Sequence, residues 1–219
     1  MKRIIERTED GSATLFVPEL DEHYHSIKGA LTESEHIFIN MGLKHRPSST
    51  PRVLEIGFGT GLNAFLTMLE ADTSQRHIHY TTIERYPVSD DLIHRLKYPE
   101  QICPKRCDDF YALHTTEWNA DVKITPYFTL HKLMNDFTKY DFQGEYDVIY
   151  FDAFAPEKQP EMWSQELFNT LYARLSSGGI LTTYCAKGVI RRMLQTAGFT
   201  VERLPGPPGG KREILRASK

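Results

Sequence analysis

The sequence is poor in cysteine, has no long apolar run and carries no large excess of charge of either sign. Its three cysteines are an odd number without the paired spacing of zinc ligands, which argues against a disulfide scaffold and a metal site. No stretch of about 18 apolar residues is present, which argues against a membrane-spanning helix. The first ten residues lack the apolar core of a secretory signal. We therefore expect a cytoplasmic protein with reduced thiols, no metal and no membrane partner.

The net charge of −3 offers no general attraction to nucleic acid, but basic residues are concentrated near the C-terminus. Between residues 185 and 219 there are eight lysines and arginines against two glutamates. Such a segment is either a solvated face or a contact surface for an anionic partner, and both interpretations stay open here. The basic residues are Lys187, Arg191, Arg192, Arg203, Lys211, Arg212, Arg216 and Lys219.

Residues 51–219 alternate apolar strand patterns with helical spacing, whereas residues 1–50 show no such alternation beyond an amphipathic stretch over 30–41. The alternation predicts an α/β domain with a mostly parallel seven-stranded sheet, helices on both faces and an N-terminal extension that packs on it. The expected strands cover 53–56, 77–84, 128–132, 146–151 and 180–184. One expected helix begins at residue 62, and two others cover 166–175 and 189–196. A closing hairpin is expected over 200–204 and 213–216.

The strand over 53–56 runs into a glycine loop, Gly57-Phe58-Gly59-Thr60-Gly61, at the start of a helix. Glycine is needed where a ligand approaches the backbone closely, because a Cβ would block it. The spacing is G-x-G-x-G rather than the G-x-G-x-x-G of dinucleotide sites, and Glu55 suits the cationic methionine end of S-adenosylmethionine (SAM) better than a phosphate. Glu84 ends the next strand, where an acid binds ribose hydroxyls. The pattern predicts a SAM site in a Rossmann-like methyltransferase fold.

Asp136 follows the third predicted strand, and two roles are open for it. Its side chain either accepts a hydrogen bond from the adenine amino group or caps the helix that follows. The complete set of predicted SAM-binding residues is Glu55, Gly57, Phe58, Gly59, Thr60, Gly61, Asn63, Glu84 and Asp136.

Asp152 follows the strongly apolar strand over 146–151. Ligands of open α/β sheets bind beyond the carboxyl ends of the strands, so we expect this carboxylate beside the transferred methyl group. It can orient an ammonium, help remove its proton and stabilise the charge that develops on nitrogen. Phe154 and Trp163 can flank a flat group, although core packing is favoured for Trp163. The Asn/Asp-Pro-Pro-aromatic loop common in methyltransferases of base amines is absent.

Five segments together resemble the methyltransferase domain of the MnmC family of tRNA 5-methylaminomethyl-2-thiouridine biosynthesis proteins. The resemblance covers nearly the whole chain, and Asp152-Ala153-Phe154-Ala155-Pro156 through Met162-Trp163 is its most specific part. The other segments are 24–39, with Tyr24-His25-Ser26 and Gly29-Ala30-Leu31-Thr32-Glu33-Ser34, then 57–63, Glu84-Arg85-Tyr86-Pro87 and Lys211-Arg212-Glu213-Ile214-Leu215.

The resemblance implies methyl transfer from SAM to the aminomethyl nitrogen of a wobble uridine in tRNA, with Asp152 as the catalytic residue. Phe154 and Pro156 are expected on the substrate side, and Lys187, Arg191, Lys211 and Arg212 are expected to contact phosphates of the anticodon stem-loop. The bifunctional members carry a second, FAD-dependent oxidoreductase domain, for which a chain ending at residue 219 has no room. We therefore expect a standalone methyltransferase that depends on a separate oxidoreductase for its substrate.

Three other functions remain as alternatives. One is a SAM-dependent methyltransferase of a small amine or carboxylate metabolite, which suits the acidic net charge. A second is aminopropyl transfer from decarboxylated SAM, and the third is a non-catalytic SAM- or RNA-binding module, which would not need Asp152. His23, His25 and His36 cluster in the N-terminal block and either line the mouth of the substrate site or cap it. A structural role is favoured, because they lack metal-ligand spacing.

Overall fold

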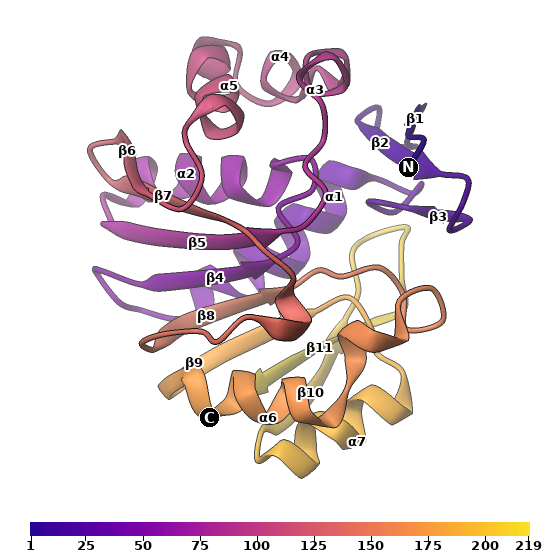
Figure 1. Ribbon diagram of the computed structural model, residues 1–219, viewed down its shortest axis with the longest axis vertical. Helices are drawn as coiled ribbons and strands as arrows, with labels where there is room; N and C mark the ends of the chain where they lie inside the picture. Colours follow the sequence, from indigo (N-terminus) through magenta and orange to yellow (C-terminus); the bar gives the residue numbers. More distant parts are fainter.

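The computed structural model describes residues 1–219 and contains a central sheet of eight strands (Figure 1). In chain order these are β4 Arg52–Ile56, β5 Ile78–Glu84, β6 Asp121–Thr125, β7 Phe128–Met134, β8 Tyr146–Phe151, β9 Leu175–Thr183, β10 Thr200–Pro205 and β11 Glu213–Ser218. The spatial order is β10-β11-β9-β8-β4-β5-β7-β6. The five middle strands pair in parallel, and β10, β11 and β6 are antiparallel at the two edges.

Seven α-helices accompany the strands: α1 Ala30–Ser34, α2 Leu62–Ser74, α3 Asp90–Leu96, α4 Tyr98–Ile102, α5 Cys107–Thr115, α6 Gln165–Arg174 and α7 Gly188–Ala197. Successive residues of a strand point to opposite faces of the sheet, and the two hydrophobic cores follow this period. Val53 of β4 packs in one core with residues of α2 and α5, and its neighbour Leu54 packs in the other with residues of α6 and α7. Figure 1 shows α6 and α7 at one end of the molecule and α3, α4 and α5 at the other.

The first 50 residues add a small antiparallel sheet of three strands, β1 Ile4–Arg7, β2 Ala13–Val17 and β3 Glu22–His23. After this sheet, α1 continues into a π-helical segment over Glu35–Asn40. Leu15 of β2 and Ile37 of that segment are fully buried in the core that also contains Val53 of the main sheet. The N-terminal residues therefore share a hydrophobic core with the rest of the chain.

The predicted fold class is confirmed, with two differences in detail. The sheet has eight strands rather than seven, because the polar segment Asp121–Thr125 forms an antiparallel edge strand whose alternate side chains face solvent. Strand β9 begins at Leu175, whereas the sequence predicted a helix up to that residue and a strand from 180. Leu175 has extended backbone angles and pairs with Tyr146 of β8, and this pairing ends α6 before the glycines are reached.

The strand order changes direction between β4 and β8. From β4 the chain moves outward through β5 to β7, and it then returns to β8 and continues on the other side to β9. The loops that leave β4 and β8 therefore diverge and open a crevice at the carboxyl edge of the sheet, where ligands bind in folds of this kind.

Candidate active site

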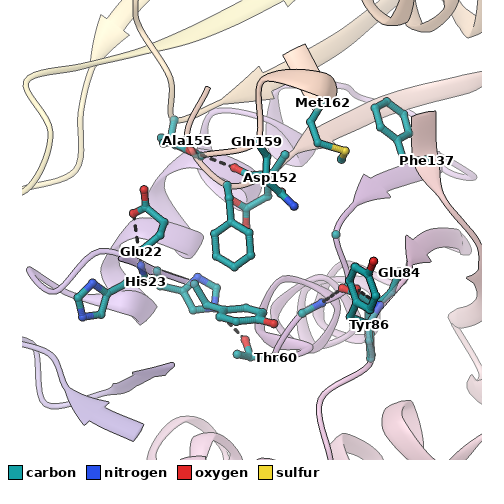
Figure 2. Close-up of a pocket in the computed structure, with 18 of the residues that line it drawn as sticks. Glu22, His23, Thr60, Glu84, Tyr86, Phe137, Asp152, Ala155, Gln159 and Met162 are labelled. Carbon is teal, nitrogen blue, oxygen red and sulfur yellow. Dashed lines mark hydrogen bonds between the residues drawn. The ribbon is translucent and has the colours of Figure 1, made fainter. Parts of the chain in front are cut away.

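A cavity of about 700 Å³ lies at this edge of the sheet and is lined by the loops after β4, β5, β7 and β8. Its size falls within the roughly 300–1,000 Å³ of typical small-molecule sites. Figure 2 shows Asp152 between two groups of side chains, with Glu84 and Tyr86 on one side and Glu22 and His23 of the N-terminal extension on the other. We call these two sides the glycine-loop end and the acceptor end of the cavity.

The glycine loop lines the cavity through Gly57, Phe58, Gly59 and Thr60, and Asn63 follows on α2. Gly57 has φ +94°, and a Cβ there would lie 3.2 Å from the backbone oxygen of Asp152. At their first residues, before they diverge, the loops after β4 and β8 thus lie so close together that only glycine fits without strain. Gly61 does not line the cavity, because it faces His114, whose Nε2 would lie 2.6 Å from an added Cβ.

Glu84 holds the glycine loop in place. Its Oε2 accepts a hydrogen bond from the backbone nitrogen of Gly59 at 3.0 Å, and its Oε1 accepts one from that of Tyr86 at 2.7 Å. Each carboxylate oxygen keeps a further acceptor position. The carboxylate can therefore bind hydroxyl groups in the cavity while it fixes the loop.

Asp152 lies at the carboxyl end of β8 and accepts a hydrogen bond from Nδ2 of Asn63 at 2.9 Å. Burial and the nearby carboxylate of Glu33 raise the pKa of Asp152 to about 7. A carboxyl group with this pKa exchanges a proton readily near neutral pH, as general acid–base catalysis requires.

Glu55, predicted to contact the ligand, does not line the cavity. Its side chain is fully buried at 0% exposure beneath the glycine loop and accepts a hydrogen bond from Thr82 Oγ1 at 2.8 Å. Burial raises the pKa of Glu55 well above its ordinary value, so the side chain is held neutral. The prediction of direct contact is therefore corrected: the alternation of β4 points this side chain to the face of the sheet that α2 covers, where Asn63 and Tyr80 lie beside it.

Asp136 lines the cavity and also caps a short 3₁₀ helix over Phe137–Lys139. Its Oδ1 accepts a hydrogen bond from the backbone nitrogen of Thr138 at 3.0 Å, and its Oδ2 pairs with Arg85 at 2.8 Å. The capping role, one of the two open interpretations, is therefore present. Contact with adenine stays a prediction.

Phe154 lines the cavity, whereas Pro156 does not. The ring of Phe154 meets Tyr24 edge to face at 5.0 Å between centroids, which joins the loop after β8 to the N-terminal extension. Trp163 is buried in the core beside α6, and its Nε1 donates a hydrogen bond to the backbone oxygen of Phe154 at 2.8 Å. The preference for core packing of Trp163 is thus confirmed. The predicted place of Pro156 on the substrate side is therefore corrected, since its neighbours Phe154 and Ala155 line the cavity and Pro156 does not.

The predicted phosphate-binding residues are divided between two places. Lys187 and Lys211 line the cavity, and Lys211 pairs there with Glu33, whereas Lys187 pairs with the exposed Glu157 outside it. Arg191 on α7 and Arg212 in the β10–β11 turn lie outside the cavity. The sequence did not show which of the four residues enter the cavity. Lys211 and Arg212 are adjacent, yet the turn between β10 and β11 directs them to different surfaces.

The N-terminal extension contributes more of the acceptor end than the residues alone predicted. Tyr24, His23 and His25 line it, and Tyr184 joins them from the end of β9. His25 shares a 2.8 Å hydrogen bond with Thr60 Oγ1, and burial lowers its pKa to about 4, so the ring is neutral. His36 bonds the backbone oxygen of Pro205 at 2.9 Å and lies outside the cavity. The sequence signals for this group were the resemblance, which includes Tyr24 and His25, and the clustering of the histidines, whereas Tyr184 had none.

No helix of the chain is both long enough and apolar enough to cross a bilayer. No three histidine, cysteine, aspartate or glutamate side chains lie together in a way that would hold a metal ion.

Comparison with known families gives consistent matches. A family model described as S-adenosyl-L-methionine-dependent methyltransferase matches residues 93–219. The chain is 30% identical, over 99% of its length, to the tRNA 5-methylaminomethyl-2-thiouridine biosynthesis bifunctional protein MnmC of Cupriavidus metallidurans. It is 32% identical, over 91% of its length, to the protein of the same name from Pseudomonas savastanoi pv. phaseolicola. It covers 34% and 32% of these relatives, and thus spans about a third of their length.

Two solved structures share the architecture. MNMC2 from Aquifex aeolicus matches with a TM-score of 0.77 at 24% identity, over 99% of this chain and 70% of that one. Spermidine synthase from Thermotoga maritima matches with a TM-score of 0.58 at 16% identity, over 99% of this chain and 72% of that one. At these identities the two matches show the fold alone.

Proposed function

The chain belongs to the S-adenosyl-L-methionine-dependent methyltransferase family, and we propose that it methylates the aminomethyl nitrogen of a modified wobble uridine in tRNA. The proposal of a tRNA substrate is supported by the MnmC relatives, which align with nearly the whole chain. One observation supports the proposed reaction above all. The carboxyl group of Asp152, which can exchange a proton near pH 7, lies in the same cavity as the glycine loop that Glu84 holds by a hydrogen bond.

The residues of the cavity suit a reaction in which an amine attacks a sulfonium methyl group, which SAM supplies when bound. We infer that the glycine loop and Glu84 bind SAM, while Asp152 receives the ammonium of the acceptor. Asp152 accepts the proton that this ammonium gives up, so that the nitrogen lone pair becomes available. Asn63 keeps the carboxylate in position through its 2.9 Å hydrogen bond.

The net negative charge of the cavity lining favours cationic ligands. Its lining side chains include six carboxylates and three basic groups. A sulfonium and an ammonium are therefore attracted, whereas a phosphate inside the cavity would be repelled. The same charge suits a small amine metabolite, which remains the alternative acceptor.

We propose that residues 1–50 are an extension that completes the acceptor end of a methyltransferase domain over 51–219. Six residues of this extension between 22 and 27 line the cavity, and Glu33 does so as well. An acceptor bound beside Asp152 would therefore contact both parts of the chain.

The proposed reaction is tested by radiolabelled methyl transfer from SAM to bulk tRNA that carries unmethylated aminomethyl-uridine, with an unmodified transcript as control. Label only in the modified tRNA, recovered at the wobble nucleoside, is the expected result. No label in either RNA, together with intact SAM binding, would contradict the tRNA proposal and favour the small-amine alternative.

Replacement of Glu84 by glutamine is expected to raise the dissociation constant of SAM by about 10- to 100-fold. The amide has one acceptor oxygen, so it cannot bond both backbone nitrogens that the carboxylate now holds. A lost charge-assisted hydrogen bond costs roughly 1.5–3 kcal/mol. Isothermal titration calorimetry measures the change. Glu161→Gln removes the same charge from the same cavity and serves as the control; an equal loss in both variants would mean that charge alone acts.

Neutralising Arg191 and Arg212 together is expected to weaken tRNA binding and to reduce its salt dependence. Both residues lie outside the cavity on the basic C-terminal part of the chain, Arg212 exposed and Arg191 half-buried. Each lost contact to single-stranded RNA lowers the slope of log K against log salt by about 0.7. Filter binding of tRNA to the Arg191→Gln, Arg212→Gln variant at several salt concentrations measures the slope. An unchanged slope would remove both residues from the interface.

A further inference from the structure

Lys211 and Glu33 form an ion pair that joins opposite ends of the chain inside the cavity. Lys211 lies in the turn between β10 and β11, and its Nζ contacts Oε2 of Glu33 on α1 at 2.8 Å. The side chain of Glu33 is only 7% exposed, and its Oε1 accepts a hydrogen bond from the backbone nitrogen of Ser26 at 3.0 Å. Both carboxylate oxygens of Glu33 are therefore occupied by partners of this chain.

The contacts of Lys211 lead directly to the loop of Asp152. Its Nζ also lies 4.3 Å from the centre of the Tyr184 ring, within the range of a cation–π interaction. The hydroxyl of Tyr184 donates a hydrogen bond to the backbone oxygen of Ala153 at 2.9 Å. A continuous series of contacts thus runs from Glu33 through Lys211 and Tyr184 to the residue that follows Asp152.

The position of this lysine differs from that of a phosphate contact. Its ammonium faces a nearly buried carboxylate, whereas 39% of the lysine side chain itself is exposed. Removing Lys211 therefore leaves the Glu33 carboxylate without its cation. The three groups Glu33, Lys211 and Asp152 all line the cavity. Their charges therefore act on each other and on whatever enters beside Asp152.

Several other groups face Asp152, and none of them supplies a compensating cation. Glu55 lies beneath it on β4 and is held neutral by burial, and Tyr184 is neutral because burial raises its pKa. Asn63 contributes a hydrogen bond without charge. Of the remaining lining residues at this end, Glu22 adds a negative charge, and Lys187 is paired with Glu157.

We propose that Glu33 and Lys211 are positioning residues whose ion pair closes the acceptor end of the cavity and determines how readily Asp152 accepts the proton of the substrate ammonium. The identity of the substrate in this inference rests on the proposed function. The interaction among the three side chains does not depend on it. The directions of the pKa agree with the geometry: Glu33 raises the pKa of Asp152 and Lys211 lowers it. In the intact pair the two effects oppose each other.

The test is a set of charge-removing variants with effects of opposite sign. We expect Glu33→Gln to lower the pKa of Asp152 and Lys211→Met to raise it, each by roughly one pH unit, as for charges a few ångströms away. The double variant is expected to return towards the wild-type value, because neither charge is then left unpaired. Lys211→Arg keeps the charge and is expected to preserve the wild-type value.

Two readouts separate failure of this inference from failure of the proposed function. The carboxyl carbon of Asp152, identified by its absence from the Asp152→Asn variant, is titrated by ¹³C NMR of aspartate-labelled protein without any substrate. The pH profile of kcat/KM for methyl transfer is then recorded for the same variants, and its acid limb is expected to move with the titration. If wild-type protein transfers no methyl group, the proposed function fails while the titration still tests the pair.

The matched control is the exposed pair of Arg203 and Glu213, which lies in the same hairpin outside the cavity. Arg203→Met and Glu213→Gln are expected to leave both the titration and the pH profile unchanged. Opposite shifts in Glu33→Gln and Lys211→Met, reversed in the double variant, would support the proposal. Unmoved titration in all variants, or shifts of the same sign in both single variants, would overturn it.

Discussion

Asp152→Asn is expected to lower kcat for methyl transfer by about 10²- to 10⁴-fold, the usual contribution of a general base. Asparagine has the same shape, and its side-chain oxygen can still accept the hydrogen bond that Asn63 now donates at 2.9 Å. The substitution therefore removes the charge and the proton acceptor without opening the cavity. The measurement is single-turnover transfer of radiolabelled methyl groups to modified tRNA, with SAM binding followed separately by calorimetry.

SAM affinity is expected to change by less than roughly threefold in this variant, because an interaction made mainly in the transition state affects kcat rather than binding. Glu157→Gln, on the exposed part of the same loop, is the control for a change of charge near the site. Equal activity of Asp152→Asn and wild type would contradict the catalytic assignment and favour a binding module.

The same variant also tests the pKa of Asp152 without any substrate. The folded-state pKa of about 7 lies above the ordinary value of 3.8, so the folded protein binds the proton of Asp152 more tightly than the unfolded chain does. This proton binding contributes most to the free energy of unfolding at low pH. That contribution is lost as the pH rises through about 7. Asp152→Asn is therefore expected to gain thermal stability relative to wild type as the pH rises from 5 to 8. A constant difference in Tm over this range would contradict the raised pKa.

Gly57→Ala is expected to weaken SAM binding by at least about tenfold. The φ of +94° at this position strains any residue with a Cβ, by roughly 1–2 kcal/mol. The added methyl group would also lie 3.2 Å from the backbone oxygen of Asp152, so the loops after β4 and β8 would have to move apart. Calorimetric titration with SAM measures the affinity, and thermal unfolding measures the cost to stability.

Gly209→Ala provides a matched control for the backbone strain. Gly209 has φ +71° in the β10–β11 turn, and nothing lies within 4 Å of an added Cβ. We expect a comparable small loss of stability in this variant and no change in SAM affinity. If Gly209→Ala weakened SAM binding as much as Gly57→Ala, the effect would come from global strain and not from the close approach of the two loops.

Local sequence patterns were sufficient to locate the main parallel strands along the chain and to place the glycine loop between a strand and a helix. Strand β8, predicted over 146–151, has these bounds in the structure, because a continuous apolar run between polar segments has one stable place in a sheet covered on both faces. Asp152 was found for the same reason, since a carboxylate directly after a buried strand lies at the edge where ligands bind. These inferences depend only on neighbours along the chain.

The tertiary structure decided which of the predicted residues share the cavity. Glu55 was assigned to the ligand from its place before the glycine loop, but the alternation of β4 buries it beneath the loop. Lys211 and Arg212 are adjacent in the sequence, yet one enters the cavity and pairs with Glu33 while the other stays outside. The pairing of Glu33 with Lys211 spans 178 residues, and no local pattern contains it. Long-range contacts of this kind depend on how the N-terminal extension and the C-terminal hairpin meet over the sheet, which only the packed fold determines.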